Sequence, residues 1–148
     1  MLIVFPLGLL GASVVFDIIR IVSGHAAFAM VSYWLIAAGI VGGVLAAIPG
    51  LIDWYAIPMA TRAKSVGRRH AIVVVIAIAI FFVSWRIRAG AVDFVASPIA
   101  LALSILAAFL ASIGGWLGGE LVERLGMSVH DGAHLDAPSS LTRRKVGD

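Results

Sequence analysis

Long apolar runs separated by short polar connections dominate the chain. Apart from Asp53, four stretches contain no Asp, Glu, Lys or Arg: residues 1–16, 21–61, 71–85 and 94–119. A bilayer core about 30 Å thick needs about 20 helical residues at 1.5 Å each, because unpaired backbone amides are not tolerated in hydrocarbon. The pattern therefore predicts an all-α protein, an integral membrane four-helix bundle.

Two of the four predicted spans need charged residues to reach the required length. The first must include Asp17 and Arg20 and run to residue 22, and the third needs Arg86 and Arg88, with side chains reaching toward the headgroups. The first run has no basic segment before it and no small-residue cleavage site after it, so we expect it to remain as a helix.

The second and fourth stretches are long enough by themselves. We expect the second helix over residues 26–48, with Pro49 and Gly50 ending or kinking it. Asp53 then follows a break in the helix, where a carboxylate is expected to cap the next turn.

Composition agrees with a lipid environment. The chain of 148 residues is 61% hydrophobic and only 13% charged, whereas a soluble domain carries roughly 25% charged residues. A water-soluble enzyme and a disordered tail are therefore excluded. The absence of cysteine excludes a disulfide framework, a thiolate metal site and a thiol nucleophile.

The distribution of basic residues predicts the orientation. With four spans, the side of the N-terminus carries eight basic residues and the other side three, Arg20, Arg86 and Arg88. The excess predicts a protein of the bacterial inner membrane with both termini in the cytoplasm.

We expect a four-span domain over residues 1–126 and a polar cytoplasmic tail over 127–148. Basic residues on the cytoplasmic side that face anionic lipid account for the net charge of +3, so the charge does not indicate binding to nucleic acid. The eight residues on the N-terminal side are Arg62, Lys64, Arg68, Arg69, Arg124, Arg143, Arg144 and Lys145.

Small residues at four-residue spacing predict where helices pack closely, since helices in lipid gain little from hydrophobicity. The pairs are Gly8 with Ala12, Gly39 with Gly43, Gly114 with Gly118, and Gly115 with Gly119. The spacing does not decide between packing within one bundle and packing against another subunit.

Asp17 is a candidate functional residue because it lies about one and a half turns before the end of the first span. Arg20, three residues on, shares its helix face. This spacing favours an ion pair near the interface that reaches water. The alternative is a small proton-coupled transporter that relies on Asp17.

The four histidines are the only transition-metal or haem ligands present in quantity. His25 falls on the outer side and His70, His130 and His134 on the cytoplasmic side, so His25 and His70 cannot ligate one iron across roughly 30 Å of hydrocarbon. A bis-histidine haem b would use His70 with His130 or His134. The sequence around Gly132 predicts a loop there.

Several motifs resemble a family of bacterial predicted membrane proteins known as domain of unknown function 2231. They are FPLGLL at 5–10 with Phe16 and Asp17, PGLIDW at 49–54, TRAK at 61–64 with His70, GWLGGELV at 115–122 and GAHLDAPSS at 132–140. The resemblance covers nearly the whole chain but names no activity.

What the resemblance implies is a role beside an electron-transfer chain, by analogy with relatives fused to Rieske-type or cytochrome-like domains. The residues His70, Asp53, Glu120 and His134 match the family pattern. Val4 and Val74 stand where relatives often have histidine and asparagine, which weakens a haem interpretation.

No catalytic constellation is visible in the sequence. The prediction is therefore a small integral subunit or partner of a larger membrane complex, a redox complex being one candidate. Its expected contacts are membrane lipids and other membrane-protein subunits or a second copy of itself. The alternatives are a haem b or metal-binding electron-transfer protein using His70 and His134, and the proton-coupled transporter.

Overall fold

The computed structural model describes residues 2–130, 132–137 and 139. Four α-helices account for most of them: α1 (Val4–Ser23), α2 (Ala27–Ala56), α3 (Arg62–Ala89) and α4 (Pro98–Glu123). A short 3-10 turn, η1 (Val92–Phe94), precedes α4. Each α-helix is long and apolar enough to cross a membrane, which confirms the prediction of four spanning helices.

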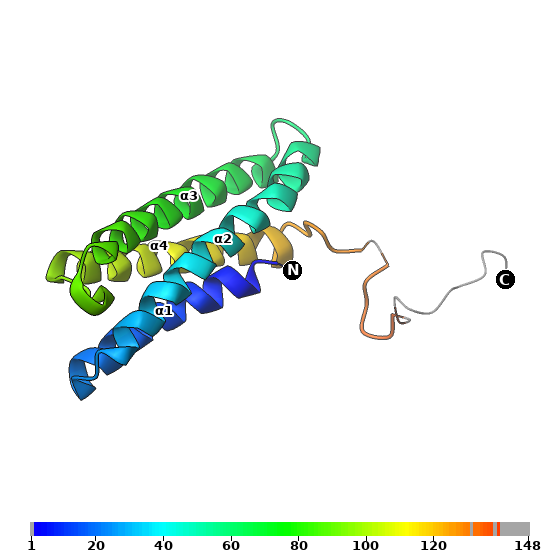
Figure 1. Ribbon diagram of the computed structural model, residues 1–148. Helices are drawn as coiled ribbons and strands as arrows, with labels where there is room; N and C mark the ends of the chain where they lie inside the picture. Colours follow the sequence, from blue (N-terminus) through cyan, green and yellow to red (C-terminus); the bar gives the residue numbers. More distant parts are fainter. Residues whose placement is uncertain (1, 131, 138, 140–148) are drawn as a thin grey trace.

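The helices form two antiparallel hairpins. The most extensive packing joins α1 to α2 and α3 to α4, and the hairpins meet mainly through α2 and α3. The start of α1, the end of α2, the start of α3 and the end of α4 gather at one end of the bundle, at the right of Figure 1. We call this the basic end, because it carries Arg62, Lys64, Arg68, Arg69 and Arg124.

Helix α2 is longer than the sequence indicated. It runs through Pro49 to Ala56, so of the two predicted effects of Pro49 and Gly50, an end or a kink, the end near residue 48 is wrong. Proline removes one backbone N–H and crowds the carbonyl four residues earlier, but neighbouring helices allow such a residue within a membrane span. At 1.5 Å per residue α2 is about 45 Å long, which exceeds the hydrocarbon thickness and requires tilt or extension beyond it.

Local sequence explains where α3 and α4 begin. The Thr61 side chain accepts a hydrogen bond from the Lys64 backbone N–H, and the Ser97 side chain accepts one from the Ala100 N–H. Pro98, which has no backbone N–H to satisfy, occupies the first position of α4. These hydroxyl caps fix the first turn of each helix in the second hairpin.

The apolar core lies at mid-bundle and takes one buried residue from each helix. These residues are Leu10, Ile36, Phe81 and Ala107. Most other large apolar side chains are exposed on the outside of the bundle, which is the arrangement expected of a protein solvated by lipid.

The predicted small-residue pairs divide into two groups. A Cβ on Gly39 would lie 2.6 Å from the Leu10 side chain, one on Gly43 would lie 2.7 Å from Ile78, and one on Gly114 would lie 2.8 Å from Val74. By contrast, a Cβ on Gly8, Gly115 or Gly119 would meet nothing within 4 Å. The glycines of the first group allow neighbouring helices to approach closely, and those of the second group leave open surface on their own helices.

Candidate functional site

A buried polar cluster joins all four helices at the end of the bundle opposite the basic end. The cluster consists of Asp17 on α1, Ser32 on α2, Ser84 and Arg88 on α3, and Ser104 on α4. Asp17 is 3% exposed and Arg88 is fully buried. The cluster lies just beyond the apolar core layer, and its residues are three to seven positions from the core residue of the same helix.

The Arg88 guanidinium has an acceptor for each of its five N–H groups. Its two terminal nitrogens donate to the two Asp17 carboxylate oxygens at 2.7 Å each, in a bidentate pair. The remaining donors reach hydroxyl oxygens: Ser32 at 3.1 Å, Ser104 at 2.9 Å and Ser84 at 3.3 Å. The buried charge is therefore both neutralised and fully hydrogen-bonded, the condition under which an ion pair persists in a low-dielectric interior.

The serine hydroxyls are also bonded to backbone carbonyls. Ser32 donates to the Ser13 carbonyl at 3.0 Å and Ser84 to the Ala100 carbonyl at 2.7 Å. Ser84 and Ser104 share a hydrogen bond of 2.8 Å. Each hydroxyl thus connects neighbouring helices as well as the guanidinium, and the cluster holds the two hairpins together.

Two sequence predictions about these charges are wrong. The partner of Asp17 is Arg88, 71 residues away, and not Arg20. The pair does not reach water, and Arg88 does not extend toward the headgroups, because the face of α3 that carries it is turned toward α1. The Arg20 Nε atom is buried and has no hydrogen-bond partner in the part of the chain that the structure describes.

His70 lies on α3 in the basic half of the bundle. Its Nδ1 is 2.9 Å from the Gly114 carbonyl oxygen, and a Cβ on Gly118 would lie 3.3 Å from the ring. Because a carbonyl only accepts, Nδ1 carries a proton, and in the neutral tautomer that this bond selects Nε2 is the acceptor. Within the described residues Nε2 has no protein partner.

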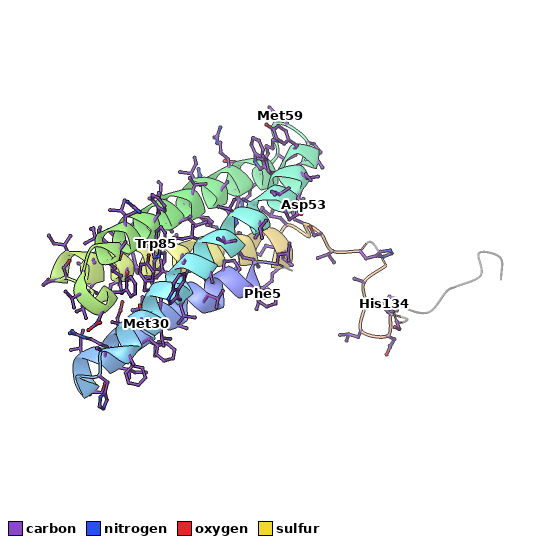
Figure 2. All side chains as sticks on the ribbon, in the orientation of Figure 1. Phe5, Met30, Asp53, Met59, Trp85 and His134 are labelled. Atoms are coloured by element: carbon purple, nitrogen blue, oxygen red, sulfur yellow. The ribbon has the colours of Figure 1, made fainter. Side chains whose placement is uncertain are left out.

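Two other histidines, His25 and His134, lie apart from His70. His25 is in the α1–α2 connection at the opposite end. His134 lies on the extended segment that follows α4, away from all four helices (Figure 2), so the structure does not bring it to His70. The expected loop around Gly132 is present, with His130 Nδ1 accepting from the Gly132 N–H at 3.1 Å. Among the described residues no group of three or more His, Asp or Glu side chains is placed to hold a metal ion.

Asp53 and Glu120 occupy the basic end. Asp53 lies inside α2, so its predicted capping role at a helix break is wrong; its side chain is exposed and appears near the end of α2 in Figure 2. Glu120, with 12% of its side chain exposed, accepts a hydrogen bond from Arg62 and lies 3.4 Å from the Arg124 Nε. Glu120 therefore ties the start of α3 to the end of α4.

Trp54 and Lys64 join α2 to α3 at the same end. The Trp54 indole N–H donates to the Lys64 carbonyl at 3.2 Å, and the Lys64 ammonium donates to the Trp54 carbonyl at 2.7 Å. The ammonium also lies 4.0 Å from the centre of a Trp54 ring, within the range of a cation–π contact. These contacts fix the α2–α3 connection.

Four apolar helices joined by a buried charged cluster define an α-helical integral membrane protein. Comparison with protein families identifies the family: the chain belongs to the predicted membrane proteins DUF2231, whose family model matches residues 1–131. This match confirms the resemblance found in the sequence. No curated protein and no solved structure matched the chain.

Proposed function

We propose that this protein is a small integral subunit or partner of a larger complex in the bacterial inner membrane, with its basic end toward the cytoplasm. The observation that carries the proposal is an open glycine face on α1. Gly8 and Gly11 are exposed, and a Cβ at either would meet nothing within 4 Å, whereas Gly39, Gly43 and Gly114 pack internally. In lipid, small residues favour close approach of another helix.

The polar cluster favours a structural role over chemistry inside the membrane. An intramembrane carboxylate marks a pathway when it lines a water-filled cavity. Asp17 is instead buried and bound to Arg88 through both oxygens. The charges are thus occupied in holding the helices together, which argues against the proton-coupled transporter.

Haem b binding is the second candidate, favoured by the hydrogen bond that leaves His70 Nε2 free. Metal-ligating histidines commonly donate their other ring N–H to a carbonyl or carboxylate. This candidate needs a second ligand, and the two expected from the sequence, His130 and His134, both lie on the segment beyond α4; neither is bonded to His70 among the described residues. It therefore ranks below the subunit proposal.

The test is purification of the tagged protein from its native membrane in mild detergent, followed by cross-linking, mass spectrometry and an absorption spectrum. We expect defined membrane-protein partners in constant proportion to the chain. Gly8→Val should abolish their recovery with little change in the melting temperature of the purified chain, because a Cβ at this position meets no neighbouring helix within 4 Å.

Ala38→Val is the matched control, since Ala38 is also exposed on a helix surface, and it should retain the partners. A chain that purifies alone and colourless would overturn the subunit proposal. A lone chain with a Soret band that disappears in His70→Ala would replace it with the haem candidate.

A further inference from the structure

The basic half of the bundle contains a partly open apolar cavity between the two hairpins. Its volume is about 570 Å³, and all four helices contribute to its walls. Leu10 of the core layer and Ala77 close it toward the middle of the bundle, while Asp53, Trp54 and Arg68 lie at the basic end. Cavities of roughly 300–1,000 Å³ with mostly apolar walls are typical small-molecule sites.

Gly115 on α4 leaves open space in the cavity wall. Gly43 and Gly118 also line the cavity, but a Cβ at Gly43 would meet Ile78 and one at Gly118 would meet His70, whereas a Cβ at Gly115 would meet nothing within 4 Å. The core layer and the buried cluster close the bundle at its centre and far end, so the cavity opens in the basic half. An elongated apolar group can enter between the hairpins there.

Three ionisable side chains, His70, Asp53 and Arg68, line the cavity together with the Ser128 hydroxyl and the Trp54 indole. His70 presents Nε2 as a hydrogen-bond acceptor because its Nδ1–H is bound to the Gly114 carbonyl. Asp53 adds a carboxylate acceptor and Arg68 a donor. Within the described residues neither Asp53 nor Arg68 has a hydrogen-bond partner in the protein.

We propose that this cavity binds an isoprenoid quinol, with its head group at His70 and Asp53 and its chain along the apolar walls. A quinol carries two O–H donors, which match the two acceptors, and the carbonyl of the oxidised quinone can accept from Arg68. A phosphate head group fits less well, because it offers no proton to His70 and meets the Asp53 carboxylate. The proposal concerns binding by this chain alone and does not depend on the proposed partner complex.

The experiment is a titration of the purified full-length chain in lipid nanodiscs with decyl-ubiquinol, followed by tryptophan fluorescence. Trp54 lines the cavity, so we expect saturable quenching that is largely lost in Trp54→Phe. His70→Gln should weaken binding about threefold to tenfold, the effect of one lost hydrogen bond.

Gly115→Leu should abolish the saturable quenching by filling the cavity. Gly119→Leu is its matched control on the same helix, since a Cβ at Gly119 also meets nothing within 4 Å but Gly119 does not line the cavity. Circular dichroism and gel filtration are the checks on folding, and we expect both variants to pass them.

Three results would overturn the proposal: quenching that does not saturate, equal affinity in Gly115→Leu and Gly119→Leu, or complete displacement of the quinol by phosphatidylglycerol at equal mole fraction. The last result would assign the cavity to a phospholipid. Because no partner protein is present in this titration, its outcome is separate from that of the co-purification test.

Discussion

Breaking the Asp17–Arg88 pair tests whether this cluster holds the bundle together. In Asp17→Asn the side chain keeps its size, but its amide NH₂ faces a terminal NH₂ of Arg88 in place of an accepting oxygen. The variant therefore loses one of two hydrogen bonds of 2.7 Å and the counter-charge of a fully buried guanidinium.

The expected loss in the free energy of unfolding follows from these contacts. A hydrogen bond to a charged group contributes about 1.5–3 kcal/mol, and breaking a buried pair by removing one partner costs about 3–5 kcal/mol. Arg88 lies next to Ala89, the last residue of α3, so an unpaired guanidinium can turn toward the headgroups and recover part of this energy. We therefore expect a loss near the lower figure, about 3 kcal/mol, which is roughly a hundredfold in the unfolding equilibrium.

The double variant Asp17→Asn/Arg88→Met separates this effect from simple loss of packing. Each serine hydroxyl of the cluster keeps a partner when the guanidinium is gone: Ser32 the Ser13 carbonyl, Ser84 the Ala100 carbonyl, and Ser104 the Ser84 hydroxyl. The double variant should therefore be more stable than either single variant, with a coupling energy of about 2–3 kcal/mol.

Reversible unfolding in mixed micelles of mild detergent and dodecyl sulfate measures all of these free energies. Arg86→Met is the control, because Arg86 is exposed two residues away on the same helix, and it should change the free energy of unfolding by less than about 0.5 kcal/mol. If Asp17→Asn were as stable as this control, or if the double variant lost the sum of the single losses, the cluster would not have the role assigned to it.

Two further predictions concern the packing of α2 and the surface of the basic end. Gly43→Val should lower the melting temperature in detergent through a loss of about 1–3 kcal/mol, because its Cβ would lie 2.7 Å from the end of the Ile78 side chain; an unchanged melting temperature would show that Ile78 moves aside freely. Glu120→Gln should cost less than about 1 kcal/mol, since 62% of the Arg62 side chain is exposed, and this difference should shrink in high salt; a larger, salt-independent loss would contradict a surface ion pair.

The spans could be predicted from the sequence because they depend on local composition. A run of about 20 apolar residues satisfies its own backbone hydrogen bonds as a helix, whatever its neighbours are. The end of α2 was missed because proline normally breaks helices in water, and the pattern around Pro49 and Gly50 does not show that the chain continues as a helix to Ala56.

The polar cluster could not be predicted because it depends on how each helix is rotated about its axis. Asp17 has Arg20 nearby in sequence, and that spacing suggested a local pair, but the partner lies two helices further on. One signal was present: each predicted helix carries a serine in the half away from the basic end, at Ser13, Ser32, Ser84 and Ser104. A polar side chain at the same depth in every span indicates a shared buried layer, since isolated hydroxyls gain nothing from facing lipid.

The layers divide the bundle into a part that maintains the fold and a part available for binding. The charged cluster and the core of Leu10, Ile36, Phe81 and Ala107 join all four helices away from the basic end. Toward the basic end the same hairpins surround the cavity. There Trp54 and Lys64 connect the two hairpins, and Glu120 with Arg62 connects α3 to α4 within the second hairpin. Because the charged cluster and the apolar core join all four helices, substitutions that fill the cavity should change what the protein binds while leaving the fold intact.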